Sequence, residues 1–215
     1  FSRQMSSINT IHDDLQDIIS ENSIISGAPA NSHLIRFHMY RAIEKIVRKL
    51  SPTGIGLTIA DWRPIIFTMM PEVTFYNLRY PEHDIQHMDK IPDNSVDVFY
   101  SEMILEHIED PQAAIDESYR ILKPGGVAIH TTVFLMPYHP SPIDLLRFSP
   151  AQLERMCHSF SEIHTGGAGN WRAMAALLMR LTRFPVKYPR GNLLSTLLKG
   201  FNPKYMIYTF VVARK

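Results

Sequence analysis

Apolar positions along this chain recur with two periods, one typical of helices and one typical of strands. Within residues 33–50, the side chains of Leu34, Phe37, Ile43 and Leu50 share one helical face while Arg and Lys fill other positions, which predicts an amphipathic helix. Further along, short runs rich in Val, Ile, Tyr and Phe predict strands, and the amphipathic stretches between them predict helices. The expected strands are 55–59, 73–78, a short one around Ile85, 96–100, 127–134, one around Ile163, and 205–212. The expected helices are 64–70, 111–122, 150–160, 171–181 and 193–198.

This alternation of strands and helices with short connections predicts the fold class. It is typical of an α/β protein with a doubly wound, Rossmann-like and mostly parallel sheet. A chain of 215 residues is long enough for one such domain. We expect residues 1–50 to form a helical N-terminal extension and residues 51–215 to form the α/β domain, which ends in basic helices.

Cysteine content and hydropathy limit the class of protein. Cys157 is the single cysteine, so an internal disulfide and a multi-cysteine metal site are excluded. No apolar run reaches the roughly 18 residues that a membrane span needs, and no secretory signal stands at the start. These features favour a cytoplasmic location.

Charge is distributed unevenly along the chain. Residues 163–215 contain nine Lys and Arg residues and no acidic residue, although the whole chain has a net charge of only +1. A solvated basic face explains this segment, and contact of residues 171–201 with an anionic membrane surface is the alternative. No nucleic-acid recognition motif is present, so we expect no nucleic-acid partner. The sequence leaves open whether the chain forms a homo-oligomer.

Two segments in the middle of the chain carry a recognisable pattern. Residues 91–98 read Ile-Pro-Asp-Asn-Ser-Val-Asp-Val and are followed by Ser-Glu-Met-Ile-Leu-Glu-His at 101–107. Residues 120–126 then read Arg-Ile-Leu-Lys-Pro-Gly-Gly. In order and spacing, these segments resemble the second half of the S-adenosylmethionine (SAM) binding core of class I methyltransferases, in the group called methyltransferase type 11. The resemblance implies an enzyme that uses SAM to methylate an acceptor.

The loop after residue 134 extends the resemblance. Pro137-Tyr138-His139-Pro140, Asp144 and Arg147-Phe148-Ser149 are similar to a stretch found in one subgroup, which is often encoded with enzymes of surface-polysaccharide assembly. This implies O-methyl transfer to a small-molecule or glycan-type acceptor, with His139 as the catalytic base. The residues expected to bind the acceptor are His107, Tyr138, Asp144 and Arg147. Alternatively, His139 only holds the loop, and Asp144 and Arg147 form an ion pair that orders it.

The resemblance also assigns positions around the cofactor. They are Ala60, Asp61, Trp62, Asn77, His87, Met88, Ser101 and Glu102. Three positions depart from the family pattern: Thr58 replaces an acid, Ala60 replaces a glycine, and Asn77 lies where an acid usually holds the ribose. A non-catalytic, methyltransferase-like binding or scaffold protein that has lost SAM is therefore the alternative function.

Two further features contain histidines but predict no metal site and no catalytic residue. His83, Asp84, His87 and Asp89 lie close in sequence, but nothing in their spacing fixes a ligand geometry, so we expect no metal site. His130 falls inside an expected strand and is interpreted as a core residue.

Overall fold

The chain folds around a six-stranded sheet with helices on both faces. In the computed structural model, residues 31–59, 65–140, 142–179, 185–187 and 193–215 are described. The strand order is β3-β2-β4-β5-β8-β6. These strands are β2 (Gly54–Ile59), β3 (Val73–Asn77), β4 (Val96–Glu102), β5 (Leu122–Val133), β6 (Glu162–Ala168) and β8 (Tyr208–Arg214). A separate antiparallel pair joins β1 (Asn31–His33) to β7 (Pro185–Lys187).

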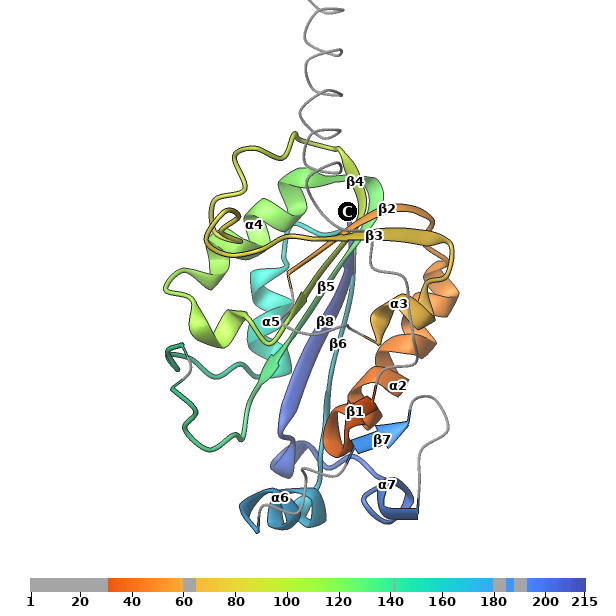
Figure 1. The fold of residues 1–215 in the computed structure, drawn as a ribbon, viewed down its shortest axis with the longest axis vertical. Helices are drawn as coiled ribbons and strands as arrows, with labels where there is room; N and C mark the ends of the chain where they lie inside the picture. Colours follow the sequence, from red (N-terminus) through yellow and green to blue (C-terminus); the bar gives the residue numbers. More distant parts are fainter. Residues whose placement is uncertain (1–30, 60–64, 141, 180–184, 188–192) are drawn as a thin grey trace, which may run out of the picture.

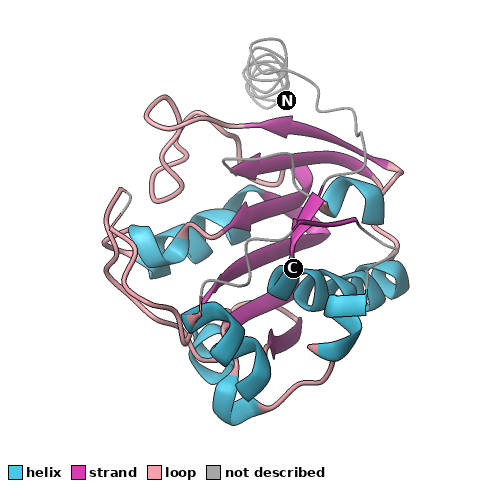
Figure 2. Cartoon of the chain, turned by 60° about the horizontal axis from the view of Figure 1, so that its bottom comes forward, coloured by secondary structure: helices cyan, strands magenta, loops and turns pink. Residues whose placement is uncertain are grey.

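The helices form two layers, as Figure 1 shows with the sheet seen nearly edge on. On one side lie α2 (Leu34–Leu50) and α3 (Ile66–Met69), and on the other lie α4 (Pro111–Ile121) and α5 (Pro150–Met156). The short elements η1 (Leu105–His107), α6 (Trp171–Leu178), α7 (Leu193–Leu197) and η3 (Pro203–Tyr205) complete the chain. The second view shows the strands between the two groups of helices (Figure 2). The predicted doubly wound, mostly parallel α/β sheet is therefore confirmed.

Strand side chains point alternately to the two faces of the sheet, and they form one apolar cluster on each face. Val98 and Tyr100 of β4 pack with α2 in one apolar cluster, while Phe99, between them, packs in the other cluster with Ala114 of α4. Successive strand side chains point to opposite faces, so the central strand β4, which is covered on both sides, is buried at every position except Asp97. The buried face of α2 belongs to the first cluster, so this helix forms part of the same core as the sheet.

Strand direction places the ligand-binding edge. Strands β2, β3, β4 and β5 run parallel, whereas β8 is antiparallel to both β5 and β6. The chain passes from β2 outward to β3 and then returns to β4 on the other side of β2. In open α/β sheets, ligands bind beyond the carboxyl ends of the strands at such a reversal. The relevant ends are Ile59, Asn77 and Glu102.

Two expectations about the elements are corrected. The residues around Ile85, all of which the structure describes, form no strand and contain only an isolated bridge between Asp84 and His87. Strand β5 begins at Leu122 and not at Val127, because Leu122 already pairs with Val96 across an irregular register. Residues 123–126, which lie between the expected helix and the expected strand, are thus part of the strand.

None of the helices in the described parts of the chain is long and apolar enough to span a bilayer. The predicted helices 171–181 and 193–198 are found as α6 and α7, although residues 180–184 and 188–192 lie outside the described residues. The basic residues Arg180, Arg183 and Arg190 fall in those gaps. The first 30 residues of the expected helical extension are outside the described part as well.

Candidate cofactor and acceptor site

Two polar side chains with buried oxygen atoms lie side by side at the reversal of the sheet. Thr58 of β2 is paired with Asn77 of β3, and the backbone N–H of Leu78 donates to the Thr58 carbonyl at 2.8 Å. Thr58 Oγ1 and Asn77 Oδ1 are both buried and have no hydrogen-bond partner among the described residues. A buried acceptor without a donor is costly, so a bound hydroxyl group would satisfy Asn77.

Glu102, at the end of β4, is held by the helix that covers this face. Arg36 Nη1 lies 3.3 Å from Glu102 Oε1, and the Tyr40 hydroxyl donates to the same oxygen. Arg36 and Tyr40 are four positions apart, so one face of α2 presents both donors. Glu102 is only 8% exposed, and these two donors stabilise its carboxylate at the sheet edge. This partnership was not predicted, although the Arg and Tyr at helical spacing could have indicated it.

Ser101 lies one residue earlier and is turned into the core. Its hydroxyl is fully buried and hydrogen-bonded to His130 Nδ1 at 2.8 Å. Any contact of Ser101 with a cofactor would therefore go through its backbone, and this role stays a prediction. His130 lies inside β5 and is itself fully buried, as expected of a core residue.

The turn that carries His87 and Met88 is held by α4. The Met88 backbone N–H donates to Glu117 Oε2 at 2.8 Å, and Arg120 Nη2 donates to the Met88 carbonyl at 2.9 Å. The Met88 side chain is 2% exposed and packs in the core, whereas His87 is exposed. Of the two, His87 is thus the side chain that could reach a cofactor, and both roles stay predictions. Among the described residues, the candidate ligands around His83 do not gather into a metal cluster.

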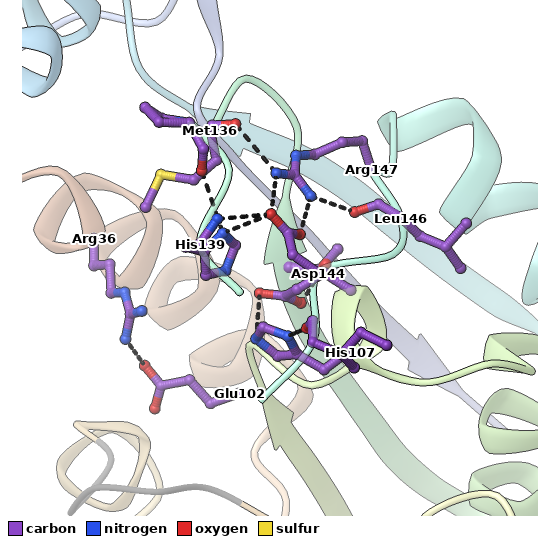
Figure 3. Close-up of polar contacts among 12 residues, drawn as sticks. Arg36, Glu102, His107, Met136, His139, Asp144, Leu146 and Arg147 are labelled. Atoms are coloured by element: carbon purple, nitrogen blue, oxygen red, sulfur yellow. Dashed lines mark hydrogen bonds and ion pairs between the residues drawn. The ribbon is translucent and has the colours of Figure 1, made fainter. Parts of the chain in front are cut away.

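The loop after β5 is organised around Asp144, whose side chain is 1% exposed. Arg147 Nη2 donates to Asp144 Oδ2 at 2.7 Å, and Arg147 Nη1 donates to Oδ1. The His139 backbone N–H donates to Asp144 Oδ2 at 2.9 Å, and His139 Nδ1 lies 3.1 Å from the same oxygen. The hydrogen bonds from Arg147 hold the pKa of Asp144 well below its ordinary value. Asp144 and Arg147 therefore form the ordering ion pair, and Asp144 orients His139 (Figure 3).

This loop also meets η1. The backbone N–H groups of Leu145 and Leu146 both reach the Glu106 carbonyl, at 2.9 and 3.3 Å. His107 Nδ1 is hydrogen-bonded to the Ile143 carbonyl. As a result, the rings of His107 and His139 stand edge to face with centroids 5.1 Å apart. The structure thus brings together His107, His139, Asp144 and Arg147, while Tyr138 projects outward and is 74% exposed.

Glu106 lies beneath these histidines and belongs to the same 3-10 turn as His107. Its side chain is fully buried, and Oε2 accepts a hydrogen bond from the Thr132 hydroxyl at 2.7 Å. Burial raises the pKa of the Glu106 carboxyl. In the sequence, only the adjacent Glu106 and His107 indicate a site here, because α4 and β5 separate them from His139 along the chain.

The described part of this edge fits a nucleoside cofactor. The unpartnered Asn77 oxygen is an acceptor for a ribose hydroxyl, and Glu102 provides a carboxylate at the end of a nearby strand. Ala60, Asp61 and Trp62 lie outside the described residues, so their predicted roles stay predictions.

Comparison with known proteins identifies the core of the chain. Residues 69–130 match the sequence family described as the methyltransferase domain. A probable S-adenosylmethionine-dependent methyltransferase of Mycolicibacterium smegmatis is 35% identical over 72 residues, which are 32% of this chain and 28% of that protein. The mitochondrial 2-methoxy-6-polyprenyl-1,4-benzoquinol methylase of Schizosaccharomyces pombe is 28% identical over 111 residues, which are 50% of this chain and 33% of that protein. The chain therefore matches a third or less of the length of these curated relatives.

Solved structures share the fold. A SAM-dependent methyltransferase from Archaeoglobus fulgidus superposes with a TM-score of 0.50 at 11% identity, covering 81% of this chain and 94% of that one. A Haemonchus contortus phosphoethanolamine N-methyltransferase 2, in complex with S-adenosyl-L-methionine, has a TM-score of 0.50 at 15% identity and covers 83% of this chain and 52% of that one. Residues 69–130 therefore match the methyltransferase domain family, and the sheet has the fold of these SAM-dependent methyltransferase structures.

Proposed function

We propose that this chain catalyses SAM-dependent methyl transfer to the oxygen of a small-molecule or glycan-type acceptor bound at the loop after β5. The observation that carries the proposal is the His139–Asp144–Arg147 assembly, which lies at the carboxyl edge of a methyltransferase sheet. The glycan element rests on the resemblance of residues 137–149. The matching proteins include a malonyl-[acyl-carrier protein] O-methyltransferase of Yersinia pestis and phosphoethanolamine N-methyltransferase 3 of Arabidopsis thaliana, so the oxygen acceptor is a proposal about this chain alone.

SAM, when bound, supplies a methyl group on a sulfonium sulfur. The residues at the ends of β3 and β4 would hold it, with Asn77 accepting a hydrogen bond from a ribose hydroxyl and Glu102 near it. An oxygen acceptor must lose its proton as the new bond forms, and we propose that this loss depends on His139. His139 Nδ1 faces Asp144 Oδ2 and the Pro137 carbonyl, so Nε2 is the ring nitrogen left for the acceptor side.

Calorimetric titration of the full chain with SAM and with S-adenosylhomocysteine tests the cofactor step. Micromolar binding is expected, and Asn77→Ala should weaken it about tenfold, since a lost hydrogen bond is worth about 1 kcal/mol. The matched control is Thr74→Ala, which changes an exposed residue of the same strand. No heat up to millimolar ligand would overturn the proposal and favour the scaffold protein that has lost SAM.

The acceptor step is tested by the formation of S-adenosylhomocysteine with hydroxylated acceptors. His139→Ala should abolish turnover and leave SAM affinity unchanged. His158→Ala, which removes an exposed histidine elsewhere, is the control. Full activity of the His139→Ala variant would remove His139 from the mechanism.

We further propose that α6 gives this protein a peripheral contact with an anionic membrane. Trp171 and Leu178 lie two helical turns apart on one helix and are 58% and 67% exposed. Met179 follows at 62% exposed, and Arg172 next to Trp171 is exposed as well. An exposed apolar stripe beside cations favours a lipid surface with negative charge.

A further inference from the structure

We propose that Glu106, His107 and His139 bind a divalent transition-metal ion such as Zn²⁺. Each of the three residues offers one ligand atom, and these atoms all lie within 4.8 Å of one another. Glu106 Oε1 is 3.9 Å from His107 Nε2. Two histidines and one glutamate are a ligand set that zinc and other first-row metals use when positions are left open. Together these three residues form the His–His–Glu cluster.

Hydrogen bonds to the far side of each histidine fix which atom faces the centre. His107 Nδ1 meets the Ile143 carbonyl, which can only accept, so Nδ1 carries the proton and Nε2 has the lone pair. His139 Nδ1 meets the Asp144 carboxylate at 3.1 Å and the Pro137 carbonyl at 3.3 Å, both acceptors, so the same argument applies. The neutral form of each histidine therefore presents an Nε2 lone pair.

The glutamate adds a third acceptor. Oε2 of Glu106 is occupied by the Thr132 hydroxyl, but the buried Oε1 has no hydrogen-bond partner in the part of the chain that the structure describes. The cluster thus gathers three lone-pair atoms, one of them a buried oxygen without a donor. A cation resolves this arrangement, because it binds all three acceptors at once.

The surroundings of the cluster match those of known metal sites. Metal-bound histidines usually donate their other ring N–H to a carboxylate or a backbone carbonyl. His107 Nδ1 is hydrogen-bonded to the Ile143 carbonyl, and His139 Nδ1 is hydrogen-bonded to the Pro137 carbonyl and lies 3.1 Å from the Asp144 carboxylate. Arg147 in turn donates a hydrogen bond to Asp144 and so holds the carboxylate that orients the ring of His139. Figure 3 shows this succession from Arg147 through Asp144 to His139, with His107 below.

The spacing requires a small movement on binding. Ligands about 2.1 Å from a tetrahedral ion lie about 3.4 Å apart, so the three side chains would close by roughly 1 Å. Both histidines are partly exposed while Glu106 is buried, so the remaining coordination positions would open toward solvent. If the proposed function holds, those positions would take the acceptor hydroxyl, and His139 would then serve proton loss as a ligand of the ion.

The test uses Co²⁺ alone as a probe on the full chain after treatment with EDTA. One Co²⁺ per chain should bind and give intense visible absorption, which Zn²⁺ then displaces. Glu106→Gln and His139→Ala should each lower Co²⁺ affinity at least tenfold. Asp144→Asn, which removes the negative charge that faces both His139 Nδ1 and Arg147, should lower it about tenfold. Glutamine keeps the volume of Glu106 and its bond to Thr132, so folding, checked by circular dichroism, should be retained.

The control is His158→Ala, which should bind Co²⁺ as the parent chain does. Co²⁺ that does not bind, or that binds the Glu106→Gln and His139→Ala variants equally well, would overturn the site. If Co²⁺ leaves the ring NMR signals of His107 and His139 unchanged, neither histidine binds the ion, and this result also overturns the site. SAM titration of the same EDTA-treated protein is read separately, so failure of the metal site and failure of the methyltransferase proposal are distinguishable.

Discussion

Thr58 and Asn77 lie opposite each other on paired strands, and each carries a buried side-chain oxygen that no donor among the described residues reaches. The resemblance of the sequence predicts that both residues stand where class I methyltransferases usually have an acid. The pair therefore replaces two carboxylates by neutral groups at the cofactor end of the sheet. We therefore expect the affinity for SAM to rise when a carboxylate is restored at one of these positions.

Asn77→Asp should raise SAM affinity roughly tenfold. A hydrogen bond to a carboxylate is worth about 1 kcal/mol more than one to a carboxamide, and about 1.4 kcal/mol corresponds to a factor of ten. Calorimetric titration measures the change, with Thr74→Asp on the exposed side of the same strand as the control. Equal or weaker binding of Asn77→Asp would mean that Asn77 does not contact the ribose.

The stability of the chain should fall in acid because of His130. Burial lowers the pKa of His130 from 6.5 to about 3. Between these two values the unfolded chain takes up a proton that the folded chain refuses, so this contribution is complete above pH 6.5 and is lost as the pH falls. One such group lowers the free energy of unfolding by about 1.4 kcal/mol per pH unit.

His130→Gln removes this titration and keeps a polar group near Ser101 and Ser118, which contact the ring at 2.8 and 3.2 Å. Denaturant unfolding at pH 7, 6, 5 and 4 should give a flatter pH dependence for the variant. The exposed residue His158 provides the control substitution. Parallel pH profiles for His130→Gln and the parent chain would contradict the prediction.

Arg120→Lys should destabilise the connection between β3 and β4 by about 2 kcal/mol, because several hydrogen bonds of one charged group are lost together. Arg120 binds Glu117 through Nε at 2.7 Å and donates to the Ile91 and Met88 carbonyls at 2.8 and 2.9 Å. A lysine has one nitrogen and cannot reach these acceptors together, and hydrogen bonds of charged groups are worth about 1.5–3 kcal/mol before discounting for solvent. Unfolding in urea measures the loss, and Arg155→Lys at an exposed position of α5 should cost nothing measurable.

Binding to anionic vesicles should depend on the exposed end of α6. The full chain should sediment with phosphatidylglycerol-containing vesicles and not with pure phosphatidylcholine, and added salt should weaken the association. Leu178→Ser combined with Met179→Ser should reduce binding at least tenfold without changing the melting temperature, because both side chains are exposed. Absence of vesicle binding at low salt would refute the peripheral contact.

Most strands and helices could be predicted from the sequence, because a buried element has a local pattern of apolar residues. Strands β2 and β5 contain apolar runs that are buried on both faces, and α2 and α4 show a helical period, so each could be located from its own residues. The strand expected at Ile85 failed for the same reason, since a buried apolar residue in a turn looks like a strand residue. Ile85 is 3% exposed but lies between the two residues of a single bridge.

The candidate site was less accessible from the sequence. Asp144 and Arg147 were foreseen because they lie close in sequence, and the structure pairs them. The His–His–Glu cluster joins η1 to the loop after β5. The partners of Glu102 come from α2, which lies more than 60 residues earlier in the chain. Such contacts depend on the tertiary arrangement, which residue spacing does not encode.

The position of β8 has a consequence for how this chain reaches its fold. Residues 208–214 pair on one side with β5 and on the other with β6, although β5 ends at Val133, long before them in the chain. During synthesis, β5 and β6 are complete while the strand that joins them is still missing, so each exposes an unsatisfied edge. Exposed strand edges can pair with the strands of other chains. Pairing β8 with both edges requires contacts between residues far apart in the sequence, and such contacts form slowly. We therefore expect nascent chains of this protein to remain aggregation-prone until residue 214 has left the ribosome.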